Sequence, residues 1–177
     1  KKDNIVFGHM RLAIIDLEER SNQPFTYCHK GKSILLTFNG EIYNYISIKN
    51  ELSIKGYEFA TNSDTEVIAA SFLEWGASCF DHFIGMWAIA IKSEGELILS
   101  RDRVGKKPFY YSVSDTRQIS FSSSMKALAL ITDQYKIDKK GLELYFALGY
   151  TPAKYSILEN IFKVEPGEIF VFSKIEN

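Results

Sequence analysis

The chain has 177 residues, of which 46% are hydrophobic and 24% are charged, and its 21 basic and 22 acidic residues give a net charge of −1. This composition excludes a disordered or fibrous protein and predicts one globular domain over residues 1–177. The near-neutral charge gives no electrostatic reason for a nucleic-acid partner or an anionic membrane surface, and no apolar run is long enough to span a bilayer.

Segments rich in β-branched and aromatic residues predict the strands, beginning near the start of the chain. Residues 5–15 are expected to form one or two strands, and residues 34–38 a buried strand. Between Gly85 and Ile91, bulky side chains alternate with alanines, which indicates a strand packed on both faces. A turn at residues 93–96 follows it. The later predicted strands are residues 97–99, 109–113, 119–122 and 169–172.

Three helices are predicted between these strands. The first starts near Asn44 and stops at Gly56, and the third spans residues 139–148 between an aspartate cap and a terminal glycine. The second begins with a capping box, in which the Ser63 hydroxyl should accept a hydrogen bond from the Glu66 N–H while Glu66 reaches back. Many strands and a few helices, not strictly alternating, predict an α+β fold with layered sheets and helices outside.

The dipeptide Asn39-Gly40 permits two interpretations. Asn-Gly between apolar runs is the strongest short signal for a hairpin turn. The same pair could form an oxyanion hole, because an Asn side-chain amide beside a Gly backbone N–H supplies two fixed donors where negative charge develops. Glycine also lets a substrate approach the backbone closely. From the dipeptide alone, both interpretations stay open.

Two charged residues, Arg11 and Asp64, also permit a structural and a functional interpretation. Arg11 stands near an apolar segment and could be a charge at its rim, or could grip a carboxylate with its planar guanidinium. Asp64 lies in a first helical turn, where the helix dipole favours an acid, but it could equally pair with an ammonium group. Together the two side chains would recognise the charged ends of a free amino acid, with Asn39 and Gly40 facing its side chain.

Cysteine and histidine usage predicts neither a metal site nor a disulfide framework. The three histidines and two cysteines are scattered, and no pair has the spacing of zinc ligands. Cys28 is interpreted as a small hydrophobic residue rather than a nucleophile, although His29 follows it. Two cysteines in a chain of this length favour a reduced, cytoplasmic setting.

The stretch Ser100–Tyr111 is the densest in charge. A run of this kind is usually a solvated loop, and Gly105 and Pro108 mark turns within it. An exposed loop is therefore expected here.

Taken together, these segments resemble a class II glutamine amidotransferase domain, and most closely the glutaminase domain of glutamine-hydrolysing asparagine synthetases. Each matching stretch is short, but the set occurs in the family's order and covers nearly the whole chain. The stretch Arg101–Tyr111 favours the asparagine synthetase branch. The matching stretches are Gly8–Asp16, Asn22–Pro24, Phe38–Asn44, Asn62–Glu66, Gly85–Ala88, Arg101–Tyr111, Lys126–Leu128 and Pro166–Gly167.

The resemblance implies a fold, an activity and a set of binding residues. The fold would be the N-terminal-nucleophile four-layer α/β/β/α sandwich, with two stacked antiparallel sheets, and the activity would be hydrolysis of L-glutamine to glutamate and ammonia. Arg11 would hold the α-carboxylate, Asp64 the α-ammonium, and Asn39 and Gly40 the oxyanion, with Glu41 beside them. The backbone of Leu12, Ala13, Ile14 and Ile15 would line the pocket.

The nucleophile is the largest departure from the family pattern. The family uses a cysteine at the mature N-terminus, whose own α-amino group acts as the base. Here residue 1 is lysine and both cysteines are internal. The expectation is that the nucleophile segment precedes Lys1, and that residues 1–177 alone do not hydrolyse glutamine.

The resemblance also implies partners outside this chain. It implies no cofactor in this domain, and it places ATP and Mg²⁺ in a C-terminal synthetase domain of the same polypeptide, which converts aspartate to asparagine through an aspartyl-adenylate. A homodimer is expected by analogy. Two alternatives remain open: a non-catalytic domain that keeps the fold as a scaffold, and a glutaminase that feeds an amide-forming ligase with another acceptor.

Overall fold

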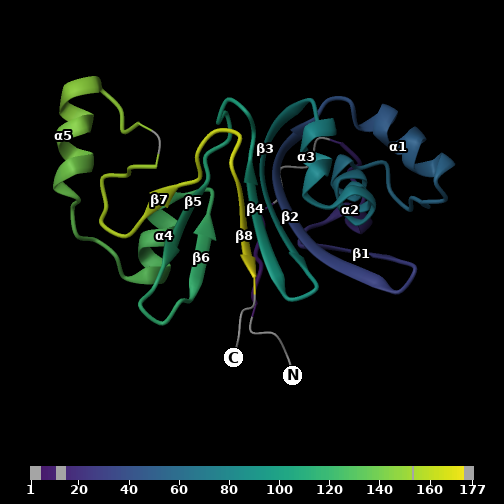
Figure 1. The fold of residues 1–177 in the computed structure, drawn as a ribbon, viewed down its shortest axis with the longest axis horizontal. Coiled ribbons are helices and arrows are strands. Elements are labelled where there is room, and N and C mark those ends of the chain that lie inside the picture. Colours follow the sequence, from purple (N-terminus) through teal and green to yellow (C-terminus); the bar gives the residue numbers. More distant parts are fainter. Residues whose placement is uncertain (1–4, 11–14, 153, 174–177) are drawn as a thin grey trace. The chain divides into compact units, whose positions relative to one another are not determined.

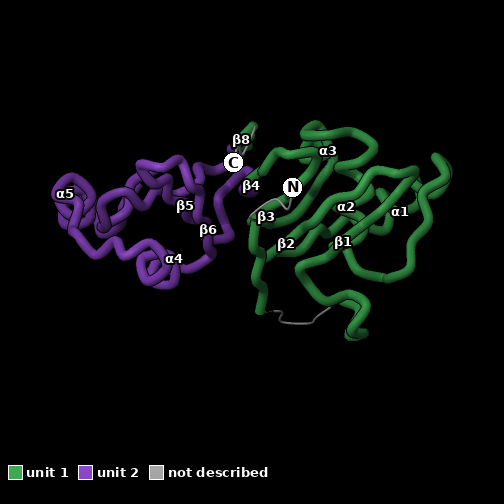
Figure 2. Tube along the Cα trace, turned by 90° about the horizontal axis from the view of Figure 1, so that it is seen from below, with its two compact units in different colours: residues 1–100, 169–177 green, residues 101–168 purple. Residues whose placement is uncertain are grey.

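A computed structural model of the chain describes residues 5–10, 15–152 and 154–173 (Figure 1). The chain divides into two compact units, coloured separately in Figure 2. The first unit comprises Lys1–Ser100 and Ile169–Asn177, and the second comprises Arg101–Glu168. Asn39, Gly40, Glu41 and Asp64 all belong to the first unit.

The first unit is built on a five-stranded antiparallel sheet in the order β1-β2-β3-β4-β8. The tight turn between β3 and β4 has positive φ angles at Glu94 and Gly95, as a two-residue hairpin turn requires. This turn lies where the sequence predicts it. The strands are β1 (Phe25–His29), β2 (Lys32–Ile42), β3 (Gly85–Ser93), β4 (Glu96–Arg101) and β8 (Ile169–Ser173).

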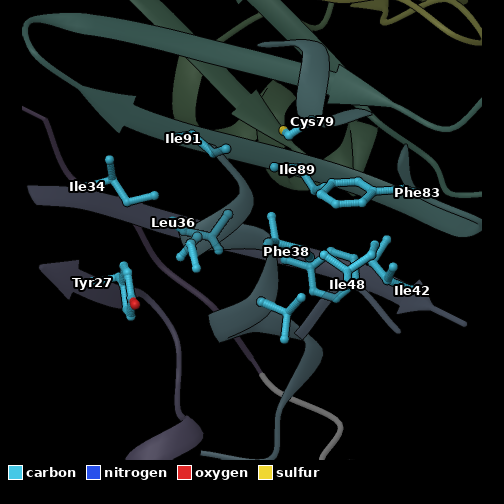
Figure 3. Close-up of a cluster of buried hydrophobic side chains, with 14 of the residues drawn as sticks. Tyr27, Ile34, Leu36, Phe38, Ile42, Ile48, Cys79, Phe83, Ile89 and Ile91 are labelled. Atoms are coloured by element: carbon cyan, nitrogen blue, oxygen red, sulfur yellow. The ribbon is translucent and has the colours of Figure 1, made fainter. Parts of the chain in front are cut away.

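Three helices accompany this sheet: α1 (Tyr45–Ile54), α2 (Asp64–Trp75) and the short α3 (Cys79–His82). Apolar side chains of α1 and α2 pack against one face of β2 and β3. Figure 3 shows part of this core, in which side chains from β2, β3, α1 and α3 gather into one cluster. The labelled residues are Tyr27, Ile34, Leu36, Phe38, Ile42, Ile48, Cys79, Phe83, Ile89 and Ile91.

The two faces of strand β2 differ, because successive side chains of a strand point to opposite sides. Its even-numbered residues from Ile34 to Ile42, apart from Gly40, are buried in this core, whereas the odd-numbered residues are partly exposed. Asn39 and Glu41 therefore lie on the face of β2 that is opposite the helices α1 and α2. In β3, the whole stretch Trp87–Ile91 is buried, which confirms the prediction of a strand packed on both faces.

The second unit contains a three-stranded antiparallel sheet in the order β6-β5-β7 and two helices. Ser124 caps the first of these helices, with its hydroxyl accepting from the Ala127 N–H at 3.3 Å. Asp138 caps the second as expected, because its carboxylate accepts from the N–H groups of Lys140 and Gly141. The elements are β5 (Tyr110–Val113), β6 (Ile119–Ser122), β7 (Phe162–Lys163), α4 (Met125–Thr132) and α5 (Lys139–Leu148).

The α+β class and the two antiparallel sheets agree with the sequence analysis, but two local predictions are wrong. Of the strands expected in residues 5–15, the described residues 5–10 form none, and Val6 and Met10 are almost fully exposed, while residues 11–14 lie outside the described chain. The predicted capping box also has different partners. The Ser63 hydroxyl accepts from the Thr65 N–H, while Glu66 binds the preceding loop instead of the Ser63 N–H.

Candidate functional site

Asn39 and Gly40 lie inside strand β2, so the hairpin interpretation of this dipeptide is wrong. They pair with Ala88 and Trp87 of β3 in a regular antiparallel register. The turn that joins β1 to β2 instead uses Lys30 and Gly31, both with positive φ. The dipeptide alone cannot show whether it lies in a turn or in a strand. The pairing of β2 with β3 over nine residues depends on contacts that are distant in sequence.

The backbone N–H groups of β2 alternate between its two edges, as they do in any antiparallel strand. Directly after the strand, the Tyr43 N–H donates to the Ile84 carbonyl at 2.7 Å, on the β3 side. The even-numbered N–H groups face the other edge. There the Phe38 N–H donates to Gln23 Oε1 at 2.6 Å, and the Ile42 N–H donates to Asp64 Oδ2 at 3.1 Å. The Gly40 N–H lies between these two and points to the same edge.

No strand covers this part of the β2 edge within the described chain. Pairing of β1 with β2 runs only from Lys32 to Leu36. Beyond that point the edge is occupied by side chains, with Gln23 at Phe38 and Asp64 at Ile42. The Gly40 N–H is therefore placed to bind a ligand atom that approaches the strand edge between these two side chains.

The backbone around position 40 leaves no room for a side chain. A Cβ atom built on it would lie 2.1 Å from the Met86 carbonyl oxygen and 2.8 Å from Cα of Trp87, both backbone atoms of β3. Such contacts are far shorter than van der Waals packing allows. Glycine is thus required for β2 and β3 to approach each other here.

The side-chain amide of Asn39 forms no hydrogen bond with any described residue. The contrast with Asn44, five residues later, is informative: its amide donates to the His82 carbonyl at 2.9 Å and accepts from the Ile84 N–H at 2.9 Å. Asn44 thus holds the ends of β2 and β3 together. The Asn39 amide makes no such structural bond to the described chain and is available to a ligand.

Asp64 is the first residue of α2 and is 95% buried, with 5% of its surface exposed. Burial raises the pKa of its carboxyl above the ordinary value, although the N–H groups of Ile42 and Thr65 act in the opposite direction. The negative charge of Glu41 raises this pKa further. A buried carboxylate whose ionised form is disfavoured would be stabilised by a ligand cation. The structure thus brings Asp64 to the strand that carries Asn39, Gly40 and Glu41.

A polar network supports the loop that precedes Asp64. The buried carboxylate of Glu66 accepts from the Ala60 N–H at 3.0 Å and from the N–H and hydroxyl of Thr61, each at 2.7 Å. The next N–H, that of Asn62, donates to Asp16 Oδ2 at 2.7 Å, and this bond is the main reason why the pKa of Asp16 is lowered. The loop is therefore held from both sides.

Arg11, Leu12, Ala13 and Ile14 lie outside the described residues. On one side of them, His9 Nδ1 lies 3.1 Å from the Thr37 hydroxyl on β2. On the other side, Ile15 is partly buried and Asp16 binds Asn62, two residues before Asp64. The described residues on either side of this stretch thus contact strand β2, which carries Asn39, and the loop that precedes Asp64.

The sequence analysis did not assign a role to Gln23, although it quoted the residue within Asn22–Pro24. Its side-chain amide accepts from the Phe38 N–H and donates to the Thr65 hydroxyl at 3.3 Å. Gln23 thus contacts the residue before Asn39 and the residue after Asp64. The only sequence signal was its place in the family-matching stretch Asn22–Pro24, which did not indicate these contacts.

The charge-dense stretch Ser100–Tyr111 is less solvated than predicted. Asp102 is fully buried, and its carboxylate accepts from the N–H groups of Val104, Lys106 and Lys107. The Arg101 guanidinium donates to three backbone carbonyls. These two side chains order the loop from within, and burial lowers the pKa of Arg101.

Within the described ranges of the chain, no three His, Cys, Asp or Glu side chains gather closely enough to hold a metal ion. No helix among them is long and apolar enough to cross a bilayer.

Comparison with known sequences connects this geometry to a family. Residues 1–177 match the family described as "Glutamine amidotransferase domain". A Methanocaldococcus jannaschii protein named as a glutamine-hydrolysing asparagine synthetase is 40% identical over 97% of this chain and 36% of its own length. Asparagine synthetase (glutamine-hydrolysing) 3 of Bacillus subtilis is 36% identical over 97% of this chain and 28% of its own length. The chain therefore spans only about a third of these relatives.

Comparison with solved structures identifies the same fold. Glutamine phosphoribosylpyrophosphate amidotransferase of Bacillus subtilis superposes with a TM-score of 0.64, at 23% identity, over 93% of this chain and 32% of its own. A likeness at this identity shows the fold alone, and it agrees with the expected α+β class with two antiparallel sheets.

Proposed function

The chain belongs to the family of glutamine amidotransferase domains, and from that premise we propose that it binds L-glutamine and supports hydrolysis of the side-chain amide to glutamate and ammonia. The observation that carries the proposal is the β2 edge. There the Gly40 N–H lies between the N–H groups of Phe38 and Ile42, which Gln23 and Asp64 bind. The Gly40 N–H donor and the buried Asp64 carboxyl thus lie on one edge of β2. They suit the side-chain amide oxygen and the α-ammonium group of glutamine.

Each proposed role follows from the chemistry of the residue. The Asp64 carboxylate binds the α-ammonium group, whose positive charge offsets the burial that raises the carboxyl pKa. The Gly40 N–H and the Asn39 amide donate to the amide oxygen as it becomes an oxyanion. Glu41 lies beside them and adds negative charge near Asp64. Arg11 binds the α-carboxylate through its planar guanidinium, and the backbone of residues 12–15 lines the pocket.

The attacking thiol is proposed to be a cysteine at the mature N-terminus of the full-length protein. Its thiolate would add to the amide carbon and form the oxyanion. Collapse of that intermediate would break the C–N bond, and the leaving nitrogen would take up the thiol proton held by the terminal amine and depart as ammonia, leaving a thioester that water hydrolyses to glutamate.

The two cysteines of this chain do not fit that role. Cys79 is fully buried, which raises the pKa of its thiol and keeps it protonated. Cys28 pairs with Ser33, seven residues from Gly40 along β2, which corresponds to about 23 Å. Neither sulfur is placed to attack an amide held at Gly40.

The names and lengths of the relatives support a wider proposal for the whole protein. Ammonia released here would serve an ATP-dependent synthetase domain of the same polypeptide, which converts aspartate to asparagine and binds ATP and Mg²⁺ outside residues 1–177. We also propose a cytoplasmic enzyme that forms a homodimer. These relatives are named for asparagine synthesis, which favours aspartate over another acceptor.

Ammonia release from glutamine by the full-length protein tests the proposal. Arg11→Ala should raise KM for glutamine at least about tenfold, because it removes the charged partner of the α-carboxylate. Arg20→Ala is the matched control, since this exposed arginine makes only a 3.9 Å ion pair with Asp16. Glutamine binding without ammonia release would instead support a scaffold role, and an unchanged KM in Arg11→Ala would contradict the assigned binding mode.

A further inference from the structure

Gln23 joins the two parts of the candidate site through one side chain. Its Oε1 atom accepts from the Phe38 N–H at 2.6 Å, and its Nε2 atom donates to the Thr65 hydroxyl at 3.3 Å. Phe38 precedes Asn39 in β2, and Thr65 follows Asp64 in α2. The amide of Gln23 therefore contacts the element that carries the oxyanion donors and the element that carries the ammonium-binding acid.

The sheet register shows why a side chain occupies this place. Strands β1 and β2 pair Phe25 with Leu36, and continuing that register by two residues would set Gln23 opposite Phe38. At this position, however, the Phe38 N–H is bound by the Gln23 side chain rather than by a backbone carbonyl of β1. The end of β1 therefore leaves the edge open at Gly40 while Phe38 remains bound.

We propose that Gln23 is a positioning residue for glutamine hydrolysis, which fixes β2 at Asn39 and Gly40 relative to the start of α2 at Asp64. This inference rests on the proposed function. Glutamine would be held at Asp64 by its α-ammonium group while its amide meets the donors at Gly40. The distance between these two elements thus determines whether the amide carbon is aligned for attack, and misalignment of about 1 Å costs up to about a hundredfold in rate.

An amide is suited to this task because it carries one acceptor and one donor on a short, planar group. A methionine has nearly the same length but binds neither partner. A glutamate keeps an acceptor for the Phe38 N–H, and the Thr65 hydroxyl can donate to its second oxygen. Comparison of glutamine, methionine and glutamate at position 23 therefore separates the effect of the hydrogen bonds from the effect of side-chain volume.

The test measures glutamine hydrolysis by the full-length protein with Gln23→Met, Gln23→Glu and Thr65→Val. Gln23→Met should lower kcat about tenfold and change KM by less than about twofold, because Gln23 touches no substrate atom. Gln23→Glu should keep kcat within about threefold of the starting protein. The matched control is Gln134→Met, because Gln134 accepts only from exposed Asn160 in the second unit and kcat should not change.

A double-mutant cycle tests the link to α2. Thr65→Val alone should lower kcat about threefold, and it should lower kcat no further when Gln23 is already methionine. Thermal unfolding of every variant is measured beside the kinetics. If Gln23→Met does not fold, Thr65→Val decides the question, since it keeps the side-chain volume, and an unchanged kcat in this variant would then overturn the inference.

Two results would overturn the inference. One is a kcat for folded Gln23→Met within twofold of the starting protein, and the other is full additivity of Gln23→Met and Thr65→Val. Asn39→Ala separates this failure from failure of the proposed function. If Asn39→Ala loses hydrolysis and Gln23→Met does not, only the positioning role is lost. If Asn39→Ala hydrolyses glutamine normally, the oxyanion role of Asn39 is wrong, and if the starting protein releases no ammonia from glutamine, the proposed function and the inference built on it both fail.

Discussion

The edge of β2 at residues 38–42 and the loop at residues 101–107 both contain backbone N–H groups that a neighbouring buried carboxylate binds. In the loop, Asp102 accepts from three N–H groups and the Gly105 N–H donates to the Asp102 carbonyl. At the β2 edge, Asp64 binds the Ile42 N–H and Gln23 binds the Phe38 N–H, while the Gly40 N–H between them faces the open edge.

The difference separates a carboxylate that holds its own loop from one that we propose binds a ligand. The Asp102 carboxylate lies among N–H groups of its own loop, and those bonds define the loop's conformation. Burial dominates at Asp64 and raises its carboxyl pKa, so this group gains from a cation that none of the described residues supplies. Backbone donors and buried acids are common in proteins, and a ligand site is indicated where their bonding is incomplete.

Asn39→Ala is expected to have the largest effect on catalysis. Loss of one oxyanion donor should lower kcat for glutamine hydrolysis by about a hundred- to a thousandfold. Stability should change little, because the Asn39 amide makes no hydrogen bond to the described chain. Steady-state kinetics and thermal unfolding of the full-length protein measure both quantities. Asn44→Ala is the informative companion, since it should lower stability through loss of its bonds to His82 and Ile84.

Asp102→Ala is expected to have the largest effect on stability. It would leave three N–H groups of the loop without the buried carboxylate that accepts from them, which should lower the free energy of unfolding by about 3 kcal/mol. Urea denaturation measures this loss. Asp115→Ala serves as the control, because Asp115 is exposed. Equal stability of the two variants would show that the Asp102 bonds do not hold the loop.

Asp64→Asn should weaken glutamine binding but stabilise the unliganded protein at neutral pH. We expect KM to rise at least about tenfold, because the α-ammonium loses its counter-charge. The folded-state pKa of Asp64 is raised, so stability from its protonated form is present below 3.8, the ordinary value, and is lost as pH rises through the folded-state pKa. Asparagine avoids that loss and can still accept from the Ile42 N–H.

Unfolding measured from pH 3 to pH 8 checks the sign of this effect. The gain in stability of Asp64→Asn should be greatest at neutral pH and disappear at the acidic end. A variant that is less stable than the starting protein at pH 7 would show that Asp64 is structural, like Asp102.

Val104→Ser should have the smallest effect. The Val104 side chain is 78% exposed, while its N–H is bound by Asp102 and is retained in the variant. The free energy of unfolding should therefore change by less than about 0.5 kcal/mol. A larger loss in urea denaturation would mean that the outward side chains of this loop, and not its internal hydrogen bonds, determine its stability.

Periodicity was enough to predict the regular elements with strong local signals. The alternation in Gly85–Ile91, the aspartate and glycine around α5, and the turn before β4 each depend on neighbours in sequence, and the structure agrees with them. The sequence patterns of β1, α3, α4 and β7 are weaker, and these four elements were not predicted. Residues 5–10 show the converse, because their local pattern predicts a strand and the structure has none there.

The sequence by itself determined the chemical types in the site and their order, since Asn39, Gly40, Glu41 and Asp64 could be selected from short motifs and a family resemblance. The tertiary structure decided that Asn39-Gly40 is strand rather than turn, and that Gln23 binds next to both Asn39 and Asp64. The physical reason is that a strand edge is defined by where its neighbour ends. The end of β1 leaves the Gly40 N–H uncovered, and no property of residues 39–42 alone contains that information.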